Sequence, residues 1–112
     1  MTTEPHGTTF TMAYSDAPSL FSEVVWLRKY GRVLGSQDRE FLLRKAAMFD
    51  RIAIKETARP VIEAVERLAR QLVEHDVAHA GLSLRGSELT CGDDYRAYVR
   101  QEYLAWRRAQ DS

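Results

Sequence analysis

The sequence has little cysteine and no long hydrophobic run. Cys91 is the one cysteine among 112 residues, so an intramolecular disulfide is excluded and the thiol content fits a reducing compartment. No stretch approaches the roughly 20 apolar residues that a helix needs to cross a bilayer. The first residues also lack the cationic start and apolar core of a signal peptide. The sequence therefore predicts a cytoplasmic protein with no membrane contact.

The chain also lacks an excess of charge of either sign. Sixteen lysines and arginines balance sixteen aspartates and glutamates, and the two signs balance within each segment as well. Nucleic-acid binders usually concentrate positive charge, because neutralising phosphates supplies much of their affinity. With 45% hydrophobic and 29% charged residues, the composition is typical of a folded globular protein. Nucleic acid is therefore an unlikely partner for this chain.

The length fits one domain. Residues 1–15 are rich in threonine and predict a flexible N-terminal tail, and residues 16–112 predict a single helical domain. Within the tail, Phe10, Met12 and Tyr14 alternate with smaller residues, which is a strand-like period. An isolated strand is unstable without a partner, so a tail that packs its aromatic residues against the domain is the preferred interpretation.

From Pro18 onward the apolar residues recur at helical spacing. Asp16 and Ser19 are both candidate N-caps of the first helix, and Ser36 is the candidate N-cap of the second. Pro60 marks a break because it suits the first turn of a new helix. We expect an all-α fold, a compact bundle of about four helices with a flexible N-terminal tail. The expected helices lie near residues 18–34, 36–58, 60–80 and 93–109.

Two of these helices carry more apolar surface than one neighbour can cover. Segment 18–34 has one stripe that includes Leu20 and Val24, and a second stripe that includes Trp26 and Tyr30, so it should contact two neighbours. Segment 36–58 is apolar almost all round and should be central or buried against another chain. This surplus favours homodimerisation or binding to another protein.

The pair His75 and His79 has the i, i+4 spacing at which two imidazoles on a helix can hold one metal ion. The spacing is similar to that of a metalloprotease helix, but Asp76 stands where that motif has glutamate. A third ligand would have to come from elsewhere: His6, Cys91, Asp93 or Asp94. The preferred interpretation is that the histidines bond terminal carbonyls and complement the helix dipole, so we predict no metal and no cofactor.

The last helix carries arginines beside an aromatic stripe. Arginine next to aromatic residues is typical of protein-interface anchors and of side chains that stack on bases. The alternative is that the aromatic side chains dock this helix onto the domain. As candidate partner-binding residues we take five side chains: Tyr98, Arg100, Tyr103, Trp106 and Arg107.

Three other polar residues are weaker candidates. Cys91 precedes a predicted helix start, which can activate a thiol, but the following aspartates oppose the thiolate, so an idle thiol is expected. Lys45 and Glu56 interrupt the apolar face of segment 36–58. Each either extends its charge to water or pairs with a neighbouring helix or subunit.

No phosphate-binding loop, nucleophile elbow or paired CxxC motif is present in the sequence. We therefore expect no catalytic residues and a small non-enzymatic protein-interaction or regulatory module acting through its helical surfaces. Its partner would be another protein, a second copy of the chain, or both. A nucleic-acid-binding regulator that uses the arginines of the last helix is the second hypothesis. A metal-dependent hydrolase at His75 and His79 is the third.

Overall fold

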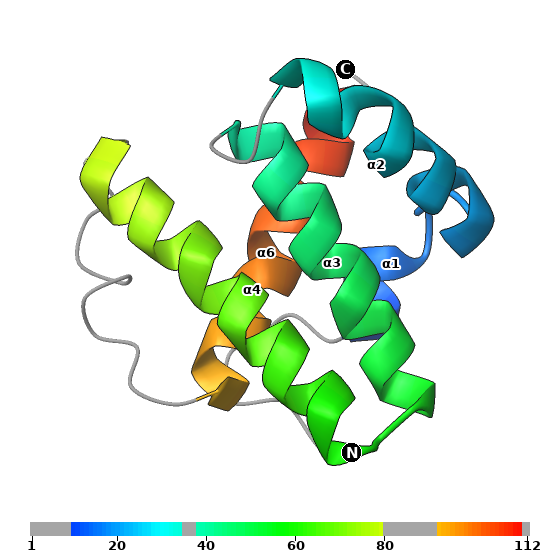
Figure 1. Ribbon diagram of the computed structural model, residues 1–112, viewed down its shortest axis with the longest axis vertical. Helices are drawn as coiled ribbons and strands as arrows, with labels where there is room; N and C mark the ends of the chain where they lie inside the picture. Colours follow the sequence, from blue (N-terminus) through cyan, green and yellow to red (C-terminus); the bar gives the residue numbers. More distant parts are fainter. Residues whose placement is uncertain (1–9, 35–37, 80–91, 111–112) are drawn as a thin grey trace.

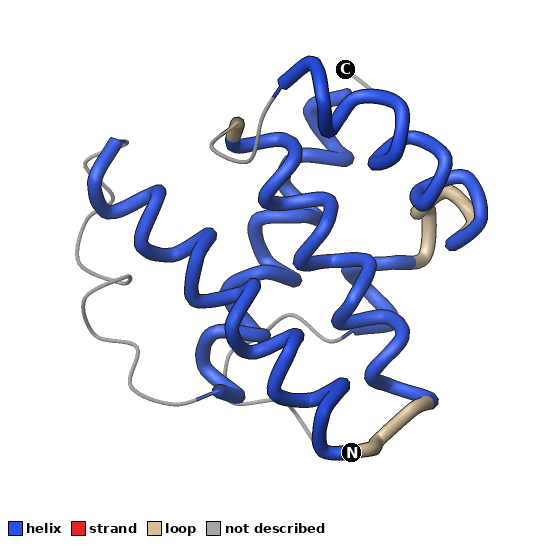
Figure 2. The backbone as a smooth tube through the Cα atoms, in the orientation of Figure 1, coloured by secondary structure: helices blue, strands red, loops and turns tan. Residues whose placement is uncertain are grey.

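Every secondary-structure element in the described part of the chain is a helix (Figure 2). The computed structural model describes residues 10–34, 38–79 and 92–110. Its elements are a short helix and four long ones: α1 (Phe10–Tyr14), α2 (Leu20–Leu34), α3 (Arg39–Lys55), α4 (Arg59–His79) and α6 (Gly92–Gln110). The predicted all-α fold is confirmed, and the four long helices match the four expected segments to within a few residues.

The helix starts follow from local side-chain chemistry. The hydroxyl oxygen of Ser19 accepts a hydrogen bond from the backbone N–H of Ser22 at 3.1 Å, as a cap at the start of α2 should. The carboxylate of Asp38 accepts from the backbone N–H of Phe41 at 3.2 Å and is the N-cap of α3. The prediction that Ser36 caps this helix is therefore wrong, because α3 starts further along the chain.

α3 lies at the centre of the bundle, between α2 and α4, with α6 behind it in the view of Figure 1. It packs against all three of these helices. One hydrophobic core cluster joins α3, α4 and α6; its buried members are Leu42, Leu43, Ala46, Ala47, Leu68, Ala69, Leu72, Val73, Tyr98, Val99 and Tyr103. The chain itself thus covers the broad apolar surface of α3, and the surplus surface predicted there is not observed.

The N-terminal segment whose sequence alternates with a strand-like period forms a helix. Residues 10–14 form α1, which packs against α6 and buries Ala13. The ring of Tyr14 meets that of Tyr103 edge-on, with centroids 5.4 Å apart. An aromatic residue of this segment therefore docks onto the domain, as the preferred interpretation expected. Residues 1–9 of the predicted tail lie outside the described part of the chain.

α2 runs along the outside of the bundle (Figure 1) and packs chiefly on α3. Its approach to α3 is close at Gly31, where an added Cβ would lie 2.8 Å from Cε1 of Phe41. A glycine at this position lets the two helix ends come together. α2 thus contacts the domain mainly through one side of the helix.

None of the helices in the described residues combines the length and the apolar character that a membrane span requires.

Candidate functional site

Three carboxylates are buried in the bundle, and each is bonded by arginine from another helix. The exposed fractions are 2% for Glu23, 0% for Asp50 and 1% for Asp76. Burying a carboxylate is strongly unfavourable unless it is paired and hydrogen-bonded. We call the three groups the Glu23, Asp50 and Asp76 clusters and describe each in turn.

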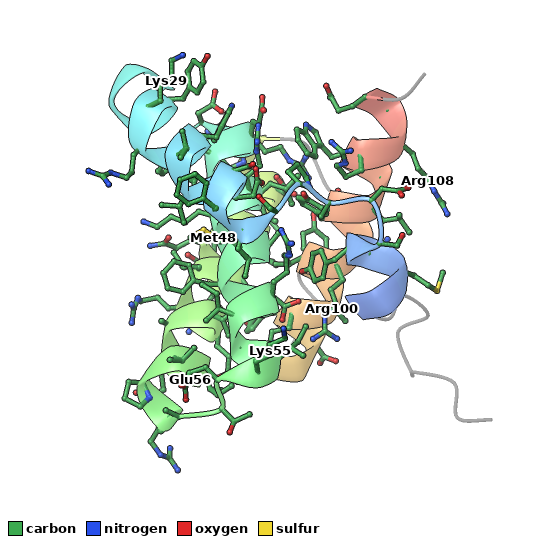
Figure 3. All side chains as sticks on the ribbon, turned by 90° about the vertical axis from the view of Figure 1, so that its right-hand side faces the viewer. Lys29, Met48, Lys55, Glu56, Arg100 and Arg108 are labelled. Atoms are coloured by element: carbon green, nitrogen blue, oxygen red, sulfur yellow. The ribbon has the colours of Figure 1, made fainter. Side chains whose placement is uncertain are left out.

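The Asp50 cluster consists of Asp50 on α3, Tyr14 on α1, and Arg96 and Arg100 on α6. Asp50 Oδ1 accepts from Arg96 Nε at 2.6 Å, and Oδ2 accepts from Arg100 Nε at 2.8 Å and from the Tyr14 hydroxyl at 2.7 Å. Figure 3 shows Arg100 between the ribbons of α1 and α6. Burial and the neighbouring Asp50 raise the pKa of Tyr14 well above its ordinary value, so the phenol is a permanent donor. This cluster ties three helices together.

The Asp76 cluster joins α3, α4 and α6. Arg39 grips Asp76 with two hydrogen bonds, Nε to Oδ1 at 2.7 Å and Nη2 to Oδ2 at 2.8 Å, and also bonds Glu102 at 2.8 Å. The Tyr98 hydroxyl donates to Asp76 Oδ2 at 2.6 Å. Burial alone would raise the pKa of Asp76, but the hydrogen bonds from Arg39, Tyr98 and His75 outweigh it and hold that pKa below its ordinary value. Asp76 is therefore ionised at neutral pH.

The Glu23 cluster fixes α2 to the bundle. Arg44 on α3 donates to Glu23 from Nη2 at 2.6 Å and from Nε at 3.2 Å, and it bonds Glu40 at 2.9 Å. The guanidinium lies 3.7 Å from the ring centroid of Trp26 and 5.1 Å from that of Trp106. Burial opposes the charge of Arg44, but its hydrogen bonds to the two glutamates raise its pKa overall. Each cluster therefore has an evident structural role as a link between helices.

The five candidate partner-binding residues lie on α6 and mostly face the interior. Tyr98 and Tyr103 are buried, Arg100 is engaged with Asp50, and Trp106 packs against the core. Arg107 Nη2 donates to the backbone carbonyl of Asp16 at 2.9 Å. The chain itself therefore occupies most of the surface that these side chains would offer to a partner, and the alternative of docking describes them better.

Two polar atoms on α6 are buried without a hydrogen-bond partner in the described structure, the Tyr103 hydroxyl and Nε of Arg107. Burial, and secondarily the charge of Glu23, raises the pKa of Tyr103 to about 12. The phenol is therefore neutral at physiological pH.

The arginines that the nucleic-acid hypothesis requires are also engaged. The side chains of Arg96 and Arg100 are each only 14% exposed, and both bond Asp50. Because both guanidinium groups are directed onto a carboxylate inside the bundle, neither is placed to contact a phosphate at the surface. The geometry thus gives no support to a nucleic-acid site on this side of α6.

The surplus apolar surface lies on α2. Four exposed side chains share one face of this helix: Leu20 (37% exposed), Phe21 (77%), Val24 (39%) and Val25 (48%). We call them the α2 patch. Arg28 continues the same face one turn further, and Lys29 extends from the outer end of the helix (Figure 3). Glu23 points inward to Arg44, whereas the four apolar side chains of the α2 patch face solvent. This is the reverse of the usual pattern of a surface helix, which buries its apolar face and exposes its charged residues.

The apolar stripes predicted that Leu20 and Val24 face a neighbouring helix, but both are exposed, and Glu23 is the residue that α2 buries. One signal was available, since Glu23 lies three residues before Trp26 and seven before Tyr30, on the stripe that packs inward. A carboxylate on an aromatic stripe, with arginines on the next helix, favours a buried ion pair. That signal identifies the inner side of α2, and therefore also its outer one.

The histidine pair ends α4 beside an open hollow of about 400 Å³ between α3 and α4. Its imidazoles stack, with ring centroids 4.4 Å apart and 18° between their planes. His79 Nδ1 bonds the carbonyl of His75 at 2.9 Å, which agrees with the expected bonding to terminal carbonyls. His75 Nδ1 lies 3.2 Å from Asp76 Oδ1.

Of the four predicted third ligands, Asp94 alone has a described side chain. His6 and Cys91 lie outside the described part of the chain, and the side chain of Asp93 is not described. Among the described residues there is no group of three or more potential metal ligands. The third hypothesis, a metal-dependent hydrolase, therefore gains no third ligand from this geometry.

Lys45 and Glu56, the two polar residues that interrupt the face of α3, have local contacts. Lys45 Nζ lies 5.6 Å from the centroid of the Phe41 ring and also lines the hollow beside the histidines. Glu56 is exposed and accepts a hydrogen bond from the backbone N–H of Ala58 at 3.2 Å, in the turn before α4. The positions of both side chains are therefore accounted for by contacts within the chain.

Comparisons of the chain with protein-family models, with curated proteins and with solved structures found no match.

Proposed function

We propose that this protein is a non-enzymatic interaction or regulatory module that binds a partner protein through the α2 patch. The observation that carries the proposal is the inverted arrangement of α2, in which Glu23 is buried and Phe21 is 77% exposed. Contiguous apolar surface of this kind on a small domain is typical of an interaction site. Burial of the patch would remove its apolar area from water, which is favourable by roughly 25 cal/mol per Å².

The form of the patch indicates the kind of partner. Leu20, Phe21, Val24 and Val25 recur at the spacing of anchors on one face of a helix, the pattern of a helix that docks into an apolar groove. Arg28 and Lys29, both exposed, give its C-terminal end a positive charge. A partner with an apolar groove and acidic residues at one end fits this surface better than a neutral or basic one.

The experiment is a comparison of two variants as baits in an extract of the cells that make the protein. Phe21→Ser with Val25→Ser removes the two most exposed apolar side chains of the patch, whereas Val77→Ser on α4 removes an apolar side chain of similar exposure (42%) elsewhere. We expect a protein captured by the wild type and by Val77→Ser to be lost from the double variant. Circular dichroism and the free energy of unfolding should stay close to those of the wild type.

A second copy of the chain is the alternative occupant, and sedimentation velocity over a range of concentrations tests it with the same variants. Self-association that the double variant loses would identify a homodimer through α2. Identical capture and identical sedimentation of the wild type and the double variant would overturn the proposal.

A further inference from the structure

An open hollow of about 360 Å³ is lined by residues of α1, the first turn of α2 and the end of α3. Its walls are mainly apolar and are formed by Tyr14 of α1, Leu20 of α2, and Ile52 and Ile54 of α3. Binding sites for small molecules typically have volumes of about 300–1,000 Å³ and mostly hydrophobic and aromatic walls. The hollow therefore has the volume and the lining of a site for a small apolar molecule.

Three charged side chains complete the lining of this hollow: Arg51, Lys55 and Glu56. Lys55 ends α3 and Glu56 follows it (Figure 3), and both side chains are exposed. Glu56 accepts a hydrogen bond from the backbone N–H of Ala58 at 3.2 Å. Two cations and one carboxylate therefore give a mainly apolar hollow an excess of positive charge.

The guanidinium group of Arg51 is held in place by a group that carries no charge. Its Nη1 donates to the backbone carbonyl of Pro18 at 2.8 Å, and its central carbon lies 5.8 Å from the centroid of the Tyr14 ring. The arginines of the three carboxylate clusters each bond a carboxylate, whereas neither Arg51 nor Lys55 forms an ion pair within the described residues. The two nitrogens of a guanidinium edge match the two oxygens of a carboxylate. An anionic group attached to an apolar body therefore suits this hollow best.

We propose that the hollow binds a small organic acid, a carboxylate with a short alkyl chain. The chain lies against Leu20, Ile52 and Ile54, and the carboxylate bonds Arg51 and Lys55 at the rim. Apolar contact removes the chain from water, while the two cations select against an uncharged molecule of the same shape.

This site does not rest on the proposed function of the α2 patch. Leu20 is the one residue that lines the hollow and also belongs to the patch. Phe21→Ser with Val25→Ser, the variant that tests the patch, changes no residue of the lining. The two proposals can therefore fail separately.

The location of the site is tested by titrating the protein with sodium octanoate and recording methyl NMR spectra. The chain has three isoleucines, Ile52, Ile54 and Ile62, and the third does not line the hollow. We expect the methyl resonances of Ile52 and Ile54 to shift with octanoate and those of Ile62 to shift least. No shift at millimolar octanoate, or equal shifts of all three residues, would overturn the proposal.

Calorimetry with the same ligand tests the two cations. Arg51→Gln should weaken binding about tenfold or more, because charge-assisted hydrogen bonds to the carboxylate are lost. Lys55→Gln should weaken it about twofold to fivefold, since an exposed ion pair contributes less. Lys55 has no bond within the described residues, so its replacement breaks no contact of the fold. Arg70→Gln, at an exposed arginine of α4, removes the same charge elsewhere and should leave affinity unchanged.

Glu56→Gln should act in the opposite direction and tighten octanoate binding about twofold, because it removes the carboxylate from the rim. A gain in affinity cannot come from a damaged fold. 1-Octanol, which lacks the charge, should bind more weakly than octanoate. Equal affinity for the two ligands, or no change in affinity in all three glutamine variants at the rim, would overturn the proposal. Self-association that is lost in Ile54→Ser but kept in Phe21→Ser with Val25→Ser would place a second copy in the hollow and overturn it as well.

Discussion

α6 and α2 differ in which of their side chains they bury and which they expose. α6 is rich in arginine and tyrosine, the residues of a typical interface, yet it directs Tyr98 and Tyr103 into the core and two arginines onto Asp50. α2 presents Phe21 and its aliphatic neighbours to solvent and buries a glutamate. Residue type alone therefore does not identify the binding surface of a helix. The number of neighbouring helices that each one packs against decides it, and α6 has three where α2 has chiefly one.

The same contrast appears in how the two helices are held. α6 contributes to both the Asp50 and the Asp76 clusters, which bind it to α1, α3 and α4. α2 is held by the Glu23 cluster, whose arginine has a second carboxylate partner in Glu40. We therefore expect the removal of a carboxylate to affect global stability most at Asp50, less at Asp76 and least at Glu23.

Asp50→Asn should have the largest effect. Asp50 is fully buried and bonds two arginines, so an amide would remove the one negative charge that both guanidinium groups share in this cluster. Loss of one member of a buried ion pair costs about 3–5 kcal/mol, and urea unfolding followed by circular dichroism would measure it. Val77→Ser, a change at a residue of α4 that is 42% exposed, is the control and should be nearly neutral. A loss for Asp50→Asn no greater than that for Val77→Ser would show that the cluster does not hold α6.

The Asp76 cluster makes stability depend on pH in a definite direction. The pKa of Asp76 is lower in the fold than its ordinary value, so the unfolded chain binds the proton more readily. The stabilisation is therefore complete above the unfolded pKa, about 4, and is lost as the pH falls through that value toward the folded pKa.

Asp76→Asn tests this dependence and should lower the free energy of unfolding at pH 7 by about 2 kcal/mol, since hydrogen bonds to a charged group are lost. Below pH 4 the difference between wild type and variant should shrink. Urea titrations at several pH values measure that difference, which cancels the contribution of the other carboxylates. If the difference in free energy of unfolding between the wild type and Asp76→Asn stays constant from neutral to acid pH, Asp76 contributes through packing and not through its charge.

The sequence predicted the helices well because their boundaries depend on local chemistry. Ser19 and Pro60 act within one turn of their own positions, and the apolar period of 3.6 needs no knowledge of neighbours. The inward direction of α2 was predicted less well. Its two stripes are similar in hydrophobicity, and the choice between them depends on the pairing of Glu23 with Arg44, a contact between different helices.

In the candidate site too, the contacts between different helices could not be predicted from the sequence. Asp76 could be seen to interrupt an apolar stripe, but its partners Arg39 and Tyr98 come from two other helices. The spacing of His75 and His79 suggested a metal site, whereas the anchoring of their Nδ1 atoms appears only in three dimensions. Spacing along one helix is readable from sequence, but tertiary hydrogen bonds are not.

Glu23→Gln should have the smallest effect on global stability and the most local one. Arg44 would keep Glu40 and its stacking on Trp26, so we expect a loss of only about 1 kcal/mol. If α2 is held mainly by this cluster, its amides should exchange with solvent faster in the variant while those of α3 and α4 change little. Hydrogen exchange followed by NMR measures both regions in one sample. Glu63→Gln, at an exposed residue of α4, is the matched control because its contact with Arg59 is long, at 3.7 Å, and both side chains are exposed. Uniform acceleration over all helices would mean that α2 and the core open together, and the contrast between α2 and α6 would then be one of exposure only.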